Sequence, residues 1–497
     1  MRTLNRMKKM YLLSLVLPAL VVMGGFFQPN QAQYQKLPPL DPPKSVTFPK
    51  VVSKTLPNQL RVYVVEDHSL PIVALQLVTE AGSVTSGTST PGLAFFTARM
   101  LDQGTQTRSA QDIAGAIDSI GGTLSASAAY ESAEISSAVL TEHSQLGFEL
   151  VADLVQNAAF KPQEIERLRE QLLGELQVEY GTPSFVADTA LRRLVFGMTP
   201  AGTPLVGTPD TLKKLTRAQV INFYKQNYIP NTSFLVVGGD ISPDEAFARA
   251  EKAFGTWKPG KAQKSVRLAQ PAMAKQLQCV VIDKPGAAQT EVRVGHPGIT
   301  QIDPRYFQGL VMNSVLGDGY SARLNKEIRI KRGLSYGARS NLVAGRGIGL
   351  FRTRCSTKAQ STFEVVQIFL DEMKRIQAEA IADEELATRK LATTGDFVQE
   401  LQSIQAVMDQ VATTIHLGQD LKTLDEFIPK VNAVTVAQAQ DFAKRQLNVT
   451  TPMIVLVGDY KVFEKDLTAL KATPTIIKMG DFDPLQPKLA KATKAKK

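Results

Sequence analysis

Histidine and cysteine are scarce in this chain of 497 residues, and their scarcity excludes several kinds of site. The four histidines, His68, His143, His296 and His416, are so widely separated in the sequence that no helix presents two imidazoles one turn apart. Two cysteines are too few for a disulfide framework. We interpret Cys279 and Cys355 as buried thiols, with a single disulfide as the alternative.

Long apolar runs are absent after the first 30 or so residues, so no transmembrane helix is expected in the rest of the chain. Four basic residues and no acidic one lie within residues 2–9, and a largely apolar run follows at residues 11–22. This arrangement is typical of a secretory signal peptide. We therefore assign residues 1–32 to a signal peptide and expect a periplasmic or otherwise exported protein. The alternative is an uncleaved signal anchor that attaches the chain to a membrane.

The net charge of +10 is concentrated at the two ends of the chain. Residues 1–32 and 488–497 contribute four and five of these charges and contain no acidic residue, which leaves the body near neutral. Nucleic-acid-binding domains carry their excess positive charge on the folded body, so we expect no nucleic-acid partner. The apolar and charged fractions, 43% and 21%, are ordinary for a globular protein with a large core.

The chain contains an internal repeat, in which positions 216–240 match positions 435–459 without a gap. Each copy predicts a helix capped by a threonine, Thr216 or Thr435, followed by a buried strand that ends at Gly-Asp. We therefore predict two homologous halves in which helix 216–228 matches helix 435–447 and strand 233–238 matches strand 452–457.

Each half begins with strands and continues with helices, a pattern that favours an α+β fold in which an antiparallel sheet packs with helices. Strands are expected at 60–65, 72–78, 278–282 and 290–294. Helices are expected at 91–103, 109–119, 144–156, 162–179, 304–315, 322–331, 360–378 and 382–402. We divide the chain into an extended arm (33–50), an N-terminal domain (51–258), a linker (259–276), a C-terminal domain (277–475) and a basic tail (476–497), with the two domains facing each other across a cleft.

The segment Pro91–Thr105, which begins Pro-Gly-Leu-Ala-Phe-Phe-Thr-Ala-Arg-Met, resembles the zinc-motif region of the pitrilysin/insulinase (inverzincin) metallopeptidases. It is most similar to their two-domain, mitochondrial-processing-peptidase-like branch. The resemblance spans about residues 45–475 and includes four more stretches: Ile120–Gly122, Pro204–Thr208, Leu316–Leu324 and Arg332–Tyr336. It implies two duplicated peptidase-like domains.

Members of this family have His-x-x-Glu-His where this chain has Phe95, Ala98 and Arg99. In the family the two histidines bind zinc and the glutamate activates a water molecule. None of the three residues here can take either role, and a guanidinium is a permanent cation that opposes zinc. Glu175 aligns with the distal zinc-binding glutamate. We interpret it as a solvated helix carboxylate, with an ion pair to Arg99 as the alternative. No catalytic set is complete, and we expect no cofactor in this chain.

The resemblance also implies a substrate-binding pair, an arginine and a tyrosine seven residues apart, which Arg329 and Tyr336 match. Gly333 would end the helix that carries Arg329. The alternative is that Arg329 belongs to a surface cluster of basic residues and that Tyr336 is a core residue of a strand. Residues 121–131 correspond to the family's strand that receives substrate at its edge, with an ordinary sheet strand as the alternative.

In two-subunit members of the family, one chain carries the zinc motif and the other completes the chamber. We therefore predict an exported, zinc-free subunit of a heterodimeric metallopeptidase, inactive alone, whose partner is a homologous zinc-bearing peptidase and whose substrate is a peptide or an unfolded protein. Zinc is expected in the partner. The alternatives are a non-proteolytic structural core or scaffold protein of the same fold, and a stand-alone peptide-binding module.

Overall fold

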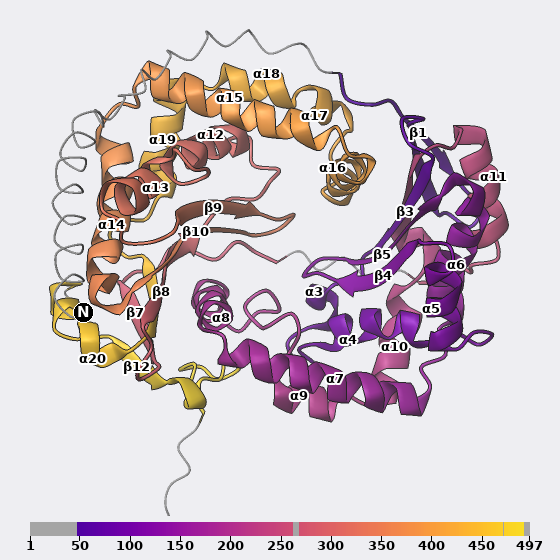
Figure 1. Ribbon diagram of the computed structural model, residues 1–497, viewed down its shortest axis with the longest axis horizontal. Helices are drawn as coiled ribbons and strands as arrows, with labels where there is room; N and C mark the ends of the chain where they lie inside the picture. Colours follow the sequence, from indigo (N-terminus) through magenta and orange to yellow (C-terminus); the bar gives the residue numbers. More distant parts are fainter. Residues whose placement is uncertain (1–46, 262–267, 471, 492–497) are drawn as a thin grey trace, which may run out of the picture. The chain divides into compact units, whose positions relative to one another are not determined.

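The computed structural model describes residues 47–261, 268–470 and 472–491, which form two six-stranded sheets with their helices (Figure 1). The expected signal segment 1–32 lies outside the described residues. Among the residues described, no helix is long and apolar enough to cross a membrane. The linker expected at 259–276 has no helix or strand in its described part.

The N-terminal sheet has the strand order β1-β2-β6-β3-β5-β4. Its strands are β1 (Val51–Thr55), β2 (Arg61–Glu66), β3 (Ile72–Thr79), β4 (Thr123–Ala128), β5 (Ala133–Leu140) and β6 (Ser233–Gly239). Neighbouring strands pair antiparallel except β2 and β6, which are parallel. The expected antiparallel sheet is thus present with one parallel pair, because β6 returns to the sheet from a chain of helices rather than through a hairpin.

The C-terminal sheet repeats this arrangement with the order β12-β7-β11-β8-β10-β9. Its strands are β7 (Gln278–Asp283), β8 (Gln289–Pro297), β9 (Ala338–Ala344), β10 (Gly349–Lys358), β11 (Met453–Gly458) and β12 (Thr475–Lys478). Here β11 and β12 both run parallel to β7. Because β12 belongs to the sheet, the C-terminal fold extends past residue 475, where the tail was expected to begin.

Helices cover both sheets. Those of the first half are α3 (Ser83–Ser86), α4 (Leu93–Arg99), α5 (Ala110–Asp118), α6 (Ser144–Asn157), α7 (Pro162–Gly181), α8 (Pro183–Phe196), α9 (Pro209–Lys214), α10 (Arg217–Asn227) and α11 (Pro243–Phe254). Those of the second half are α12 (Tyr306–Leu316), α13 (Arg323–Asn325), a π-helix (Lys326–Lys331), α14 (Thr362–Ala378), α15 (Asp383–Glu400), α16 (Ile404–His416), α17 (Lys422–Asp425), α18 (Phe427–Ala433), α19 (Val436–Gln446) and α20 (Tyr460–Phe463).

The predicted duplication is confirmed by topology. Helices α10 and α19 each begin with a capping box, Thr216 with Gln219 and Thr435 with Gln438. Strands β6 and β11, which follow them, occupy the same third position in their sheets. The helix expected at 91–103 is shorter, because α4 ends at Arg99 and a 3₁₀ turn replaces its last residues.

Two helices that the sequence analysis did not predict, α8 and α16, pack on the sheet of the opposite half (Figure 1). The apolar face of α8 covers β8 and β11, with Val186, Ala190 and Leu191 fully buried there. The equivalent helix α16 covers β3 and β6, with Met408 and Val411 fully buried. Since each sheet buries its other face against helices of its own half, the exchange gives both sheets two covered faces.

Equivalent polar contacts anchor the two exchanged helices. On α8, Asp188 accepts hydrogen bonds from Arg293 Nε at 2.8 Å and from Arg352 Nη1 at 2.9 Å. On α16, Asp409 accepts one from Gln76 Nε2 at 2.8 Å. Gln76 and Arg293 are equivalent residues, since they pair across the sheet with Val236 of β6 and Val455 of β11, which occupy matching positions of the internal repeat. Both halves therefore anchor their neighbour's helix at the same place on the sheet.

The halves also meet at their hairpin turns. The backbone N–H groups of Arg346 and Gly347, after β9, donate to the Glu131 carboxylate, after β4. Arg346 Nη1 donates to Glu80 at 2.8 Å. A cavity of about 290 Å³ lies beside these turns and has residues of both halves in its lining, among them His416 at the end of α16. A cleft between the halves was expected, and cavities lined by both halves lie here and at a second place, where one of about 840 Å³ is lined by α7, α9 and residues 479–491.

The two cysteines are free, and they lie too far apart to be joined. Cys279 on β7 and Cys355 on β10 are separated by β11 and β8, a distance of roughly 14 Å at the usual strand spacing, whereas a disulfide needs Cα atoms within about 7 Å. Burial raises the pKa of Cys355 to about 11 and that of Cys279 to about 12. The interpretation as buried thiols is confirmed, and the alternative of a disulfide between them is wrong.

The contacts of Asp188 predict a stability effect. Replacing Asp188 with alanine leaves Arg352 without its carboxylate and leaves Arg293, whose side chain is 4% exposed, with Glu291 alone. We expect a loss of about 2 kcal/mol in the free energy of unfolding, less than for a fully buried pair because Asp188 is partly exposed. Urea unfolding followed by circular dichroism measures it.

The matched control is Asp371→Ala, which removes an exposed carboxylate of α14 that faces Lys374 at 3.5 Å. It should change the unfolding free energy by less than about 0.5 kcal/mol. If both substitutions lower the unfolding free energy equally, the contacts of Asp188 contribute no more to stability than an exposed ion pair does.

Candidate functional site

The site begins at α4, whose start is fixed by two glycines from separate stretches. Gly92 and Gly207 both have positive φ angles, 91° and 76°. A Cβ atom on Gly92 would lie 2.9 Å from Val206 O, and one on Gly207 would lie 2.7 Å from Pro91 O. Any side chain at either position would push the two segments apart, so the glycines hold α4 against the loop that precedes α9.

Phe95 and Arg99 lie one helical turn apart on the partly exposed face of α4. The Arg99 guanidinium carbon is 5.9 Å from the centroid of the Phe95 ring, a cation–π contact. Ala98 is fully buried in the core with Ala94 and Phe96. The three positions of the degenerate motif therefore present a ring, a methyl group and a cation.

These residues do not fit zinc. A phenyl ring and a methyl group have no lone pairs to donate, and the Arg99 guanidinium repels a divalent cation. In the part of the chain that the structure describes, no group of three or more histidine, cysteine, aspartate or glutamate residues could hold a metal ion. The zinc chemistry of the family has no ligand set here.

Glu175 lies on the exposed face of α7 and accepts a hydrogen bond from Gln171 Nε2 at 2.9 Å. No ion pair joins it to Arg99 among the described residues. The carboxyl group whose pKa Arg99 affects is that of Asp102. Burial raises this pKa, and the Arg99 guanidinium partly offsets the rise. Glu175 is thus placed as a solvated helix carboxylate, and the alternative of a pair with Arg99 is not formed.

Arg329 lies on the exposed side of the π-helix, with its guanidinium carbon 5.0 Å from the Tyr320 ring centroid. Its basic neighbours Lys331 and Arg332 both pair with Glu327, whereas Arg329 has no carboxylate partner among the described residues. Arg329, like the exposed Lys326 of the same helix, therefore has no ion pair and keeps its charge available.

Tyr336 is 88% exposed and stands two residues before β9. Gly333, with a φ of 62°, ends the π-helix by donating its N–H to Arg329 O, and Leu334 N–H donates to Ile328 O. The turn that Gly333 allows brings the chain to Tyr336. The alternative that Tyr336 is a core residue of a strand does not hold, because the ring is exposed and outside the strand.

The two edge strands differ in what their outer edges offer. On β9, the N–H groups of Ala338 and Ser340 donate to Asn325 Oδ1 and Gly317 O, which occupy that edge. On β4 (Thr123–Ala128), no backbone group bonds to any described residue other than those of β5. An edge of this kind can accept an extended chain by strand addition.

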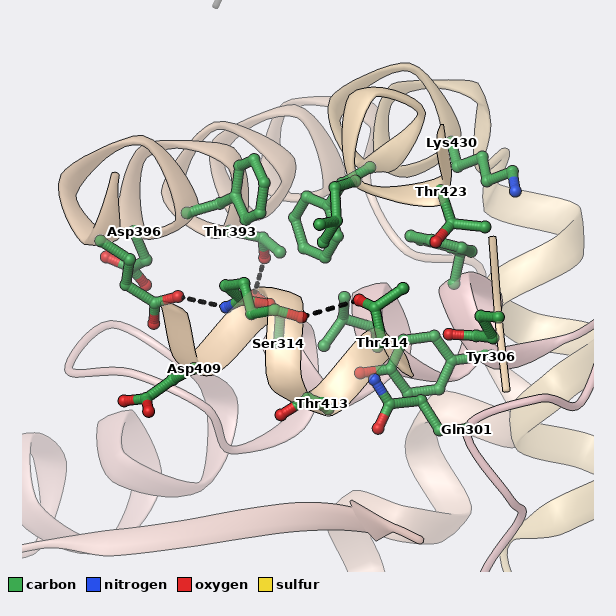
Figure 2. A pocket seen from close by; sticks show the side chains of 18 of the residues that line it. Gln301, Tyr306, Ser314, Thr393, Asp396, Asp409, Thr413, Thr414, Thr423 and Lys430 are labelled. Atoms are coloured by element: carbon green, nitrogen blue, oxygen red, sulfur yellow. Dashed lines mark hydrogen bonds between the residues drawn. The ribbon is translucent and has the colours of Figure 1, made fainter. Parts of the chain in front are cut away.

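A further cavity, of about 460 Å³, lies among α12, α15, α16 and α18. Figure 2 shows its hydroxyl groups, from Ser314, Thr393, Thr413 and Thr414, together with acidic side chains. None of the residues predicted from the sequence lines it. Sequence analysis missed it because its lining comes from five separate segments between residues 301 and 430, none of which carries a motif.

The comparisons with known proteins define the class. The model described as "Insulinase (Peptidase family M16)" matches residues 61–209, and the model described as "Peptidase M16 inactive domain" matches residues 214–392. The chain therefore belongs to the insulinase/pitrilysin (M16) peptidase family. The order of the two matches follows the two halves of the structure.

Curated relatives match most of the length of the chain. An uncharacterized zinc protease of Streptomyces coelicolor is 25% identical over 410 residues, which is 82% of this chain and 89% of that protein. The uncharacterized zinc protease YmxG of Bacillus subtilis is 24% identical over 392 residues, covering 79% of this chain and 94% of its own length.

Solved structures agree with the fold. A Pseudomonas fluorescens structure described as a peptidase M16 inactive domain superposes with a TM-score of 0.77 at 25% identity, covering 82% of this chain and 98% of that one. A Helicobacter pylori protease superposes with a TM-score of 0.73 at 18% identity, covering 82% and 99%. The chain is a zinc-protease-like member of the family whose α4 carries Phe95, Ala98 and Arg99 at the motif positions.

The chemistry of α4 predicts the metal content of the isolated chain. After dialysis against zinc-containing and then metal-free buffer, elemental analysis should find far less than one equivalent of zinc. The double variant Phe95→His and Arg99→His places two imidazoles one turn apart and should hold more zinc than the unchanged chain. One tightly held equivalent in the unchanged chain would contradict the prediction.

Proposed function

We propose that this protein is the zinc-free subunit of a heterodimeric metallopeptidase and that it holds peptide substrate for its partner. The observation that carries the proposal is the contrast between the two candidate sites. The motif positions on α4 are filled by residues that cannot bind metal, whereas Arg329 and Tyr336 remain exposed and without a carboxylate partner among the described residues. A purely structural role does not account for an exposed arginine and tyrosine at the positions that match the family's substrate-binding pair.

Arg329 and Tyr336 offer what a peptide backbone needs. A guanidinium and a phenol are hydrogen-bond donors, and both can hold a substrate carbonyl or the oxyanion that develops from it. Tyr336 carries no hydrogen bond to another described residue that would compete. In this proposal the two side chains bind and orient the substrate beside the partner's active site.

The open edge of β4 supports the same role. Its free N–H and C=O groups can pair with an extended substrate, and its side chains Ser125, Ser127 and Ala128 are small enough to let a second chain approach. A peptide or an unfolded segment satisfies this edge, whereas a folded protein without a free strand does not.

The partner in this proposal is a homologous chain that carries His-x-x-Glu-His and the zinc ion. This chain contributes the second half of the chamber and no metal chemistry. The segment at residues 1–32 supports export to a periplasm or the cell exterior, either as a cleaved signal or as a membrane anchor.

The proposal predicts the kinetics of the reconstituted pair. Alone, the chain should not hydrolyse peptides. With the partner, Tyr336→Phe removes one donor while it keeps the ring, so kcat should fall by roughly 10²-fold if the phenol stabilises the transition state. Arg329→Ala should also raise KM, because it weakens the hold on substrate. Steady-state kinetics measure both.

The matched control is Lys326→Ala, which removes another exposed cation from the same π-helix. It should leave kcat and KM near those of the unchanged pair, and sizing chromatography should show that all three variants still assemble. If the Arg329 and Tyr336 variants assemble and cleave normally, the substrate-binding role is wrong and the non-proteolytic scaffold takes its place.

A further inference from the structure

Three arginines from three neighbouring strands form a row on the C-terminal sheet. Arg293 of β8 pairs directly with Arg354 of β10, and Arg354 pairs directly with Arg339 of β9. They lie on the face on which α8 packs, because the alternating residues Thr353 and Cys355 are buried on the other side. α8 covers β8 and β11, whereas Arg354 and Arg339 lie on the neighbouring strands β10 and β9. Arg339 is exposed and Arg354 is half-buried.

The row is only partly neutralised. Asp188 and Glu291 both form ion pairs with Arg293. The side chains of Arg339 and Arg354 form no hydrogen bond and no ion pair with any described residue. Like charges directly opposite each other on adjacent strands destabilise a sheet, and the ion pairs of Arg293 offset this repulsion only in part, because Arg339 and Arg354 have none.

Charged groups nearby do not remove the excess. Asp318 lies within electrostatic range of Arg339 but forms no ion pair or hydrogen bond with it, and burial raises the pKa of that carboxyl. Arg352, two residues from Arg354 on the same face, adds a further guanidinium that shares Asp188 with Arg293. Its Nε is buried and has no hydrogen-bond partner among the described residues.

The N-terminal sheet shows that the fold does not require this row. The equivalent positions, which follow from the equivalence of Gln76 and Arg293, are Gln76, Ser136 and Ser125. These residues are uncharged, and the two serine hydroxyls bond to each other at 2.9 Å. The two sheets share topology and register, but the C-terminal sheet has arginines at three positions that are uncharged in the N-terminal sheet. Arg293 holds α8 through Asp188, so Arg339 and Arg354 are the two for which the described residues supply no partner.

We propose that this face of the C-terminal sheet binds carboxylate side chains of an extended peptide, and thus that the substrate held by this subunit is acidic. The inference rests on the proposed function and names its substrate class. Guanidinium groups bind carboxylates through two parallel hydrogen bonds. Carboxylates at alternate positions of an extended peptide recur about every 6.8 Å, which matches the spacing of Arg352 and Arg354 along β10.

A nucleic acid fits this face less well than a peptide does. Binding to a phosphate backbone uses a basic surface that neutralises about 6–10 phosphates, whereas Arg339 and Arg354 are the only members of this row without an ion-pair partner among the described residues. The open edge of β4, which accepts a peptide backbone, belongs to the same chain. We therefore assign the face to acidic peptides.

The test measures peptide binding by fluorescence anisotropy with the full chain at low salt. Two labelled peptides of equal length are compared, one with glutamate and one with glutamine at alternate positions. The glutamate peptide should bind about tenfold more tightly, the sum of two exposed pairs. The double variant R339Q/R354Q should reduce this preference to less than about twofold and leave the glutamine peptide unaffected.

Two control variants separate specific contacts from net charge. R339K/R354K keeps both charges and should retain most of the preference, while K444Q/R445Q removes two exposed charges from α19 and should retain all of it. A preference that survives in R339Q/R354Q, or binding that ignores peptide charge, overturns the acidic-substrate inference alone. No binding of either peptide overturns the proposed peptide-holding function as well. Tighter, arginine-dependent binding of an oligothymidylate of matched charge reassigns the face to nucleic acid and overturns the inference.

Discussion

The exchange of α8 and α16 between the two halves is the constraint on which the rest of the structure depends. Each sheet has one face covered by its own helices and the other by a helix that the opposite half supplies. Apolar burial drives this packing, and Asp188 fixes the position of α8 by binding Arg293 and Arg352. Neither half can bury both faces of its sheet alone, so the duplicated domains are held as one unit. The open edge of β4 and the basic face of the other sheet therefore keep fixed positions.

Much of each half could be predicted from the sequence, but the exchange could not. The ungapped match of positions 216–240 with 435–459 revealed the repeat, because threonine caps and buried strands are local signals. Helices α8 and α16 were missed. In the case of α8, only Thr182 separates its first residue, Pro183, from the end of α7 at Gly181, so no loop marks the boundary. Even a correct helix assignment gives only an apolar face. Which sheet that face covers depends on tertiary packing, which local periodicity does not encode.

The candidate site could likewise be predicted only in part from the sequence. Residue chemistry alone showed that Phe95, Ala98 and Arg99 cannot bind zinc, and the resemblance placed Arg329 and Tyr336. Only the structure showed that Tyr336 is exposed and that Glu327 pairs with Lys331 and Arg332 but not with Arg329. The row of arginines was hidden for another reason. Arg293, Arg339 and Arg354 are widely spaced along a body that is near neutral, and only strand register brings them together. Net charge averages away a local excess of this kind.

The two halves have thus diverged on surfaces that do not carry the fold. On α4, the buried residues Leu93, Phe96 and Ala98 preserve the core, while Phe95 and Arg99 occupy the face where metal ligands would stand. On the C-terminal sheet, Thr353 and Cys355 preserve the core, while Arg354 occupies the opposite face. A helix or a strand that buries one face can change its other face at little cost to stability. In this chain one such face carries Phe95 and Arg99 at the motif positions, and the other carries Arg339 and Arg354, whose side chains have no partner among the described residues.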